Sequence, residues 1–319
     1  MLGIEELKER IEITETTVEC PVKGCSEKVE RQRVVFKKED RFKCPKHNIF
    51  ISPSTFEYPS ELDNLLWKER PDLELIEKIR MVKRESRIAR DNSEDALSWN
   101  VFRFLERNNL IEGFLSLIIG TVLKSSEVIY WSYSQKESTS WSELNKARKE
   151  FGEQIERSSE PDIIIKTDNA LFFIEAKLTA GNETVPSDLK NSKKYETGGD
   201  NWFSKVFKSD YKTVAIVEKK YELLRFWLLG TWMAKQQDLD FYLINLVLSE
   251  RKADIETIFK RHTKDNQRRR FLRVTWESIY QYISNRSLSR DKDIMVRFFR
   301  NKTIGYDGSG KLQRAFSIL

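Results

Sequence analysis

Two apolar stretches separated by a short turn constrain the fold of this chain more than any other feature. Residues 161–166 read Pro-Asp-Ile-Ile-Ile-Lys, and residues 171–178 read Leu-Phe-Phe-Ile-Glu-Ala-Lys-Leu. The intervening Thr167-Asp168-Asn169 is typical of a turn, so the two stretches are predicted to pair as a β-hairpin. We expect the rest of the chain to be organised around this hairpin.

Polar side chains interrupt the second of these strands. Side chains alternate faces along a strand, so Glu175 and Lys177 share one face, while even-numbered residues 172–178 point into a core. Burying an acid and an amine without a use would be costly. Asp162, at the start of the first strand, can come close to both. Two carboxylates and a lysine at a sheet edge are predicted to form a divalent-metal site with a water-orienting amine beside it.

An acid-x-Lys triplet alone is a weak signal, because residues 218–220 and 250–252 also fit it. The triplet at Glu175 is distinguished by its apolar hairpin, by the Pro-Asp pair on the neighbouring strand and by an acid on an upstream helix. The alternative interpretation is a salt-bridged structural strand that holds no metal.

The combination of Pro161-Asp162, twelve intervening residues and then Glu175-Ala176-Lys177 resembles the PD-(D/E)xK nuclease superfamily. The resemblance extends over residues 91 to about 290. Members of that superfamily cut nucleic-acid phosphodiesters using magnesium. The resemblance implies that Asp162 and Glu175 hold Mg²⁺ or Mn²⁺ and that Lys177 orients or activates the attacking water. It also implies an α/β fold with a restriction-endonuclease-like core, a mixed central sheet flanked by helices.

A strong helix is predicted to begin at Ser93, a credible N-cap followed by Glu94 and Asp95 in the first turn. Glu94 lies on the same helix face as Leu97 and Val101. Many PD-(D/E)xK nucleases carry a glutamate near the metal on the helix before the sheet, so the resemblance adds Glu94 to the catalytic set. Compensation of the helix dipole is the alternative role of Glu94, and Asp95 is the weaker substitute.

All three cysteines lie near the start of the chain, as Cys20-x4-Cys25 and Cys44-x2-His47 separated by eighteen residues. Two short pairs across a modest loop suit tetrahedral zinc, and four ligands would make the site structural. A disulfide plus a free thiol is disfavoured by the odd cysteine count, and unliganded cysteines in a small core are the other alternative. The segment resembles a zinc ribbon or treble-clef-like knuckle, with nucleic-acid binding and scaffolding both open as its role.

These patterns predict three parts of the chain. Residues 1–58 form a small β-rich zinc-binding module, residues 59–90 a helical basic connector, and residues 91–319 a PD-(D/E)xK nuclease-like domain. Within the last part, 221–235 is predicted as a helix and 241–248 as a central strand. The stretch 179–201 is predicted to be a long polar loop beside the site.

Composition sets the broad class of partner. The chain has 319 residues with 56 Lys plus Arg and 50 Asp plus Glu, a net charge of +6 that is compatible with a polyanion. No apolar run is long enough to span a bilayer, so no membrane partner is expected. The first residues lack a signal pattern, which makes a cytoplasmic location the default expectation.

The resulting hypothesis is a metal-dependent nuclease acting on DNA, of restriction, repair or defence type by resemblance, with endonuclease activity favoured over exonuclease activity. Two alternatives stay open: a catalytically silent nucleic-acid- or protein-binding module on the same fold, and an RNA-directed nuclease. Cutting both strands of a duplex would favour a dimer, but the sequence displays no symmetric interface, so the oligomeric state stays open.

Overall fold

The computed structural model describes the chain except residues 34, 84–86, 155–157, 189–191, 287–289 and 319. It divides into two compact units. One unit contains residues 1–69, 86–104 and 276–319, and the other contains residues 70–85 and 105–275. The expected parts 1–58, 59–90 and 91–319 are contiguous in sequence, whereas each observed unit combines separate segments. Residues 84–86 of the expected connector lie outside the described residues.

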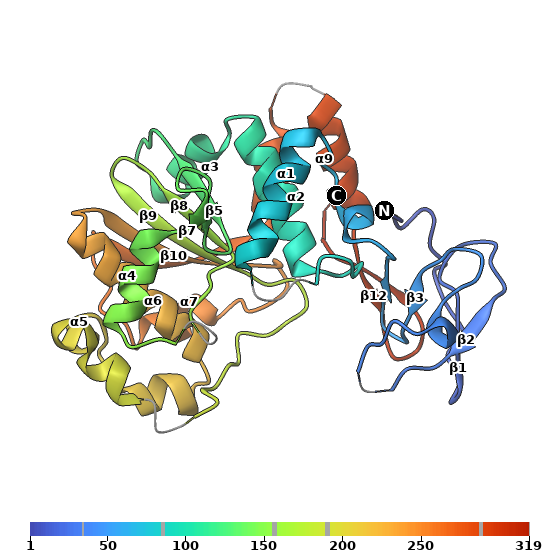
Figure 1. Cartoon of the computed structure of the whole chain (residues 1–319), viewed down its shortest axis with the longest axis horizontal. Helices are drawn as coiled ribbons and strands as arrows, with labels where there is room; N and C mark the ends of the chain where they lie inside the picture. Colours follow the sequence, from blue (N-terminus) through green and yellow to red (C-terminus); the bar gives the residue numbers. More distant parts are fainter. Residues whose placement is uncertain (34, 84–86, 155–157, 189–191, 287–289, 319) are drawn as a thin grey trace. The chain divides into compact units, whose positions relative to one another are not determined.

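A seven-stranded sheet forms the centre of the second unit (Figure 1). Its strands are β5 (Glu127–Tyr130), β6 (Tyr133–Ser134), β7 (Thr139–Ser140), β8 (Ile163–Lys166), β9 (Ala170–Ala176), β10 (Asp240–Val247) and β11 (Arg269–Thr275). They lie in the order β11-β10-β9-β8-β5-β6-β7. Strands β9, β10 and β11 are parallel, and the others pair antiparallel. The expectation of a mixed central sheet is therefore confirmed.

The predicted hairpin is present as β8 and β9, which pair antiparallel with Ile163 opposite Ile174. Strand β9 is buried along its whole length, because β8 and β10 flank it and both of its faces are covered. The expectation that only the even-numbered face enters a core is therefore too narrow. Leu171 and Phe173, on the same side as Glu175, also lie in the hydrophobic core.

Helices cover the sheet of the second unit (Figure 1). They are α1 (Arg70–Val82), α3 (Ile111–Ile119), α4 (Ser142–Glu150), α5 (Ser192–Val206), α6 (Tyr221–Gln236) and α7 (Ile255–Lys260), with a π-helical turn at Thr213–Val217. Helix α6 packs on β9 and β10, and α4 and α5 pack on α6. Gly230 of α6 allows this close approach, since a Cβ there would overlap the ring of Phe241.

The predicted polar loop 179–201 is wrong in its second half. Helix α5 begins at Ser192, although residues 198–201 depart from helical geometry within it. Buried Tyr195 and Phe203 explain the helix, because they anchor it in the core against α6. Residues 189–191 of the predicted loop lie outside the described residues.

The first unit brings together the two ends of the chain. Its elements are β1 (Thr17–Glu19), β2 (Lys28–Glu30), β3 (Phe50–Ile51), β4 (Phe56–Glu57), α8 (Trp276–Ser284), α9 (Arg290–Asn301), β12 (Thr303–Tyr306) and β13 (Leu312–Arg314), with 3₁₀ turns at Asp40–Phe42 and Glu61–Asn64. Helix α2 (Glu94–Arg107) begins in it. Backbone hydrogen bonds join the termini, such as Ile11 N to Gly310 O at 2.9 Å.

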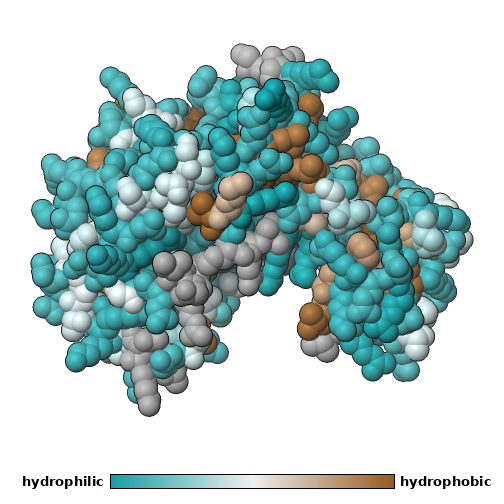
Figure 2. All heavy atoms as spheres, viewed as in Figure 1, coloured by the Kyte–Doolittle hydropathy of each residue, from teal (hydrophilic) through white to brown (hydrophobic). Residues whose placement is uncertain are grey.

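Surface polarity agrees with the composition. The face shown in Figure 2 is mostly hydrophilic, with apolar residues in scattered patches. Within the described ranges, every helix is too short or too polar to cross a membrane.

Candidate functional site

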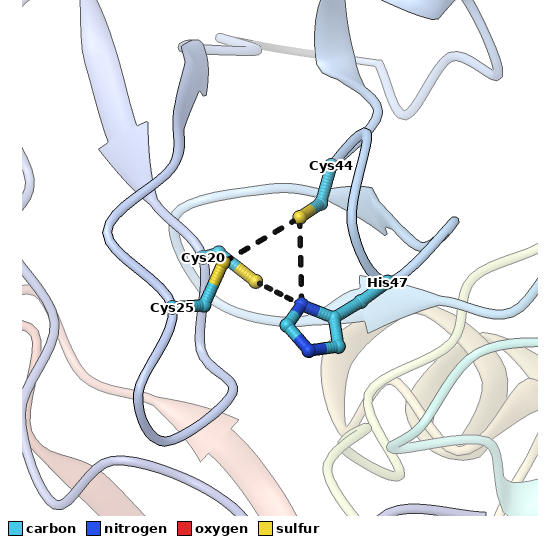
Figure 3. Close-up of side chains that lie close together, drawn as sticks. All are labelled: Cys20, Cys25, Cys44 and His47. Carbon is cyan, nitrogen blue, oxygen red and sulfur yellow. Dashed lines mark hydrogen bonds between the residues drawn. The ribbon is translucent and has the colours of Figure 1, made fainter.

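The three cysteines and His47 converge in the first unit (Figure 3). Their ligand atoms all lie within 4.8 Å of one another, and the cysteines are buried. Gly24 adopts a left-handed backbone (φ 75°) just before Cys25, as expected for a tight metal-binding turn.

Distances within this cluster fit a tetrahedral zinc ion. His47 Nδ1 lies 3.6 Å from the sulfurs of Cys20 and Cys44, and the sulfurs of Cys25 and Cys44 are 3.8 Å apart. Tetrahedral zinc, with Zn–S near 2.3 Å and Zn–N near 2.0–2.1 Å, requires separations of about 3.6 Å for nitrogen to sulfur and about 3.8 Å for sulfur to sulfur. Burial raises the pKa of the Cys20 thiol, which a bound cation would offset. The cluster is therefore compatible with the predicted zinc site.

The hairpin brings Asp162 and Glu175 together in the second unit. Asp162 immediately precedes β8, and the β8–β9 register places it next to Glu175. Its Oδ2 accepts a hydrogen bond from the backbone N of Ala176 at 2.8 Å. This bond fixes the Asp162 carboxylate against the end of β9, beside the predicted partner acid.

Lys177 lies between two acids. Its Nζ donates to Glu175 Oε1 and, at 3.0 Å, to Oε2 of Glu222 in the first turn of α6. The side chain of Lys177 is 12% exposed, which makes these ion pairs largely dry. Sequence reasoning missed Glu222. Its only signal was an acid near the start of the helix predicted over 221–235, and that signal does not say which strand the helix meets.

The surroundings of Glu175 oppose the ionisation of its carboxyl group. Glu175 is 3% exposed, and its Oε2 has no hydrogen-bond partner among the described residues. Burial raises the pKa of Glu175 well above the usual value, and the nearby carboxylates of Asp162 and Glu222 raise it further. Lys177 acts in the opposite direction but does not outweigh them. Burial alone would lower the pKa of Lys177, but the surrounding carboxylates outweigh it and raise that pKa.

The donor set suits a hard divalent cation. Carboxylate oxygens are the ligands that Mg²⁺ prefers, and one or two of them with water are sufficient. The unpaired Glu175 oxygen beside Asp162 is the feature that a cation would satisfy. In the described part of the chain, only the cysteine–histidine cluster brings three or more potential ligand atoms within 4.8 Å of one another. A cation at the hairpin would therefore have two protein carboxylates, Asp162 and Glu175, as its ligands.

Neighbouring residues extend the polar site. On β10, Asn245 lies opposite Glu175, is fully buried, and exchanges amide hydrogen bonds of 2.6 and 3.2 Å with Asn182. Glu222 also lines a cavity of about 620 Å³, whose polar and aromatic lining includes Tyr221, Arg225 and Lys194.

Arg225 follows Glu222 by three residues on α6. In the structure its Nε pairs with the buried Glu153 carboxylate at 3.0 Å, and its side chain is 14% exposed. Glu153 also accepts hydrogen bonds from Ser159 and Tyr195. The ion pair is therefore buried, which favours a structural role for Arg225.

Glu94 lies in the first unit, at the start of α2, whereas Asp162, Glu175 and Lys177 lie in the second unit. The predicted N-cap is confirmed, because Ser93 Oγ accepts a hydrogen bond from Ala96 N at 3.0 Å. The catalytic role of Glu94 stays a prediction.

Comparison of the chain with protein-family models, with curated proteins and with solved structures gave no match.

Proposed function

We propose that the protein is a metal-dependent nuclease that hydrolyses phosphodiester bonds, most readily in DNA. The observation that carries the proposal is the buried Glu175 carboxylate, which stands beside Asp162, contacts Lys177 and has one oxygen with no hydrogen-bond partner in the part of the chain that the structure describes. Three carboxylates, those of Asp162, Glu175 and Glu222, share the single ammonium group of Lys177, so a bound cation would offset the negative charge that remains. Perturbed groups of this kind cluster at functional sites.

Each side chain has a defined task in this proposal. Asp162 and Glu175 would hold the cation, with Asp162 oriented by its bond from Ala176 N. A bound Mg²⁺ would polarise the scissile phosphate and lower the pKa of a water molecule. Lys177 would orient the attacking water and, as an ammonium group, offset the negative charge that builds up on the phosphate. Glu94 is the further acid that the resemblance adds.

The arrangement of the second unit supports the finer fold assignment. The antiparallel β5, β8 and β9 are followed by α6 and then by β10, which pairs parallel with β9. A strand followed by the metal hairpin, a helix and a further strand is the order that a restriction-endonuclease-like core implies. We propose that residues 105–275 contain such a core.

We further propose that Cys20, Cys25, Cys44 and His47 bind a structural zinc ion. Four protein ligands leave no open position for chemistry. The zinc would link residues 20–25 to residues 44–47 within a hydrophobic cluster that includes the three cysteines. The module would thereby order one unit of a protein whose chemistry lies in the other.

A cleavage assay tests the nuclease proposal. Purified protein is incubated with linear, circular, single-stranded and structured DNA, and with RNA, in Mg²⁺ or Mn²⁺ and again with EDTA. We expect metal-dependent cleavage that Asp162→Asn, Glu175→Gln and Lys177→Met abolish. Glu143→Gln is the matched control, because Glu143 pairs with Lys166 at the opposite end of β8.

The outcomes separate the alternatives. Cleavage of DNA in preference to RNA supports the proposal as stated, and preferential cleavage of RNA would instead make this an RNA-directed nuclease. Intact substrates in every metal condition would leave a nucleic-acid- or protein-binding module. Cleavage that survives Glu175→Gln would show that the activity comes from elsewhere.

A further inference from the structure

The ammonium group of Lys177 is held from two directions. One partner is Glu175, two residues earlier in the same strand, and the other is Glu222 at 3.0 Å. Glu175 is the residue proposed to turn its oxygens toward a cation. Glu222 comes from α6, more than forty residues later, and is 32% exposed at its side chain. The two acids therefore differ in what they can do for Lys177.

The backbone around Glu222 is fixed to the segment that follows the hairpin. Glu222 N donates to Thr184 Oγ1 at 2.8 Å, and Tyr221 N donates to Thr184 O at 3.1 Å. Thr184 N in turn donates to Lys219 O at 2.7 Å. Thr184 thus satisfies N–H groups at the start of α6, where a helix has no internal partners for them. These bonds fix the start of α6 to the chain that leaves Lys177.

We propose that Glu222 is a positioning residue that holds the Lys177 amine beside the cation site, an inference that rests on the proposed nuclease function. A cation bound by Glu175 would weaken the ion pair between Glu175 and Lys177, and Glu222 is the carboxylate that would retain the amine. A lysine side chain has many rotamers, so a second, rigidly mounted partner keeps its nitrogen in one place.

A direct role of Glu222 as a metal ligand fits the geometry less well. Among the described residues, no set of three acids brings ligand atoms within 4.8 Å of one another. The side chain of Glu222 instead contacts Lys177 and lines the adjoining cavity of about 620 Å³. The carboxylate therefore acts on the amine, and residues that bind the cation are Asp162 and Glu175.

The test compares Glu222→Gln and Glu222→Asp with wild type and with Glu143→Gln. Glu143 is a closely matched control, since it is 30% exposed and pairs with a lysine of the same sheet at 3.2 Å. The assays are cleavage of plasmid DNA in Mg²⁺ and calorimetric titration of Mn²⁺. For Glu222→Gln we expect kcat to fall about tenfold or more, as for partners that orient metal-site groups, with KM within about twofold. Glu222→Asp should recover part of kcat, and Mn²⁺ affinity should stay within about twofold in both variants.

Three results would overturn the inference while leaving the nuclease proposal intact. The first is an unchanged kcat in Glu222→Gln when Glu175→Gln is inactive. The second is a large loss of Mn²⁺ affinity in Glu222→Gln, which would make Glu222 a ligand. The third is equal loss of kcat in Glu222→Asp and Glu222→Gln. A wild-type protein that cleaves nothing would overturn both proposals together.

Discussion

Replacing Glu175 by glutamine should stabilise the protein in the absence of metal and remove its activity. Glu175 is almost completely buried, and one of its carboxylate oxygens has no partner in the described residues. Its raised pKa means that ionisation in the folded state is opposed chiefly by burial and then by Asp162 and Glu222. Glutamine has nearly the same shape but carries no charge, so Glu175→Gln isolates the cost of that charge.

The size of the effect follows from two opposing terms. Replacing a buried ion pair with neutral groups of similar volume is often neutral or stabilising by about 1–4 kcal/mol, and this range applies here because Lys177 keeps Glu222 as its charged partner when Glu175 alone is neutralised. The bond from Lys177 weakens by about 1 kcal/mol, because hydrogen bonds to charged groups contribute about 1.5–3 kcal/mol and neutral ones about 0.5–1.5 kcal/mol. We expect a net gain of about 0–3 kcal/mol in the free energy of unfolding, and each kcal/mol should raise Tm by about 2–4 °C in a unit of about 150–250 residues.

Magnesium should reverse which of the two proteins, wild type or Glu175→Gln, has the higher melting temperature. A ligand that binds only the folded state stabilises it by about 2.7 kcal/mol at a hundred times its Kd. Wild type should gain this amount, and Glu175→Gln should gain little because it lacks a ligand. In thermal melts monitored by circular dichroism, the variant should melt above wild type in EDTA and below it in saturating Mg²⁺. Glu143→Gln should follow wild type in both conditions.

Two results would refute this reasoning. If Glu175→Gln unfolds more easily than wild type in EDTA, the carboxylate is stabilising and the structural salt-bridge interpretation of the strand gains. If Mg²⁺ raises the Tm of wild type and variant equally, the cation binds elsewhere.

Three further perturbations test other parts of the structure. Purified protein should contain one zinc ion per chain by atomic emission, and Cys44→Ser should lose it and make residues 1–58 sensitive to protease; a metal-free wild type that resists protease would contradict the zinc assignment. Burial lowers the pKa of His262, whose Nδ1 lies 2.8 Å from Ser209 Oγ, so its folded-state pKa is below the unfolded value of 6.5. Its contribution to stability is then present above pH 6.5 and lost as the pH falls through the folded pKa, so urea midpoints should drop on acidification more in wild type than in His262→Gln. Gly230→Ala should lower the free energy of unfolding by about 1–3 kcal/mol, because the new Cβ overlaps Phe241, and an unchanged urea midpoint would show that α6 can shift.

Local patterns in the sequence predicted the features that depend on neighbouring residues. The hairpin followed from two apolar runs around Thr167-Asp168-Asn169, and its antiparallel register placed Asp162 next to Glu175. The zinc ligands followed from the spacing of Cys20, Cys25, Cys44 and His47, because two close pairs need only one loop closure to meet.

Features that depend on distant parts of the chain were missed. Glu222 reaches Lys177 only because α6 crosses from β9 to β10, and nothing in the helix itself indicates that contact. The last stretch, 294–319, was expected as part of the nuclease-like domain 91–319, yet residues 276–318 form a unit with the N-terminal segment. In each case a non-local pairing prevailed over a plausible local one.

The most direct test of the central claim is a crystal structure with Mn²⁺, measured at an X-ray energy where manganese scatters anomalously. We expect a peak bound by carboxylate oxygens of Asp162 and Glu175, with Lys177 Nζ retained near Glu222. The absence of a peak at these two acids, in crystals that bind Mn²⁺ at other residues, would contradict it.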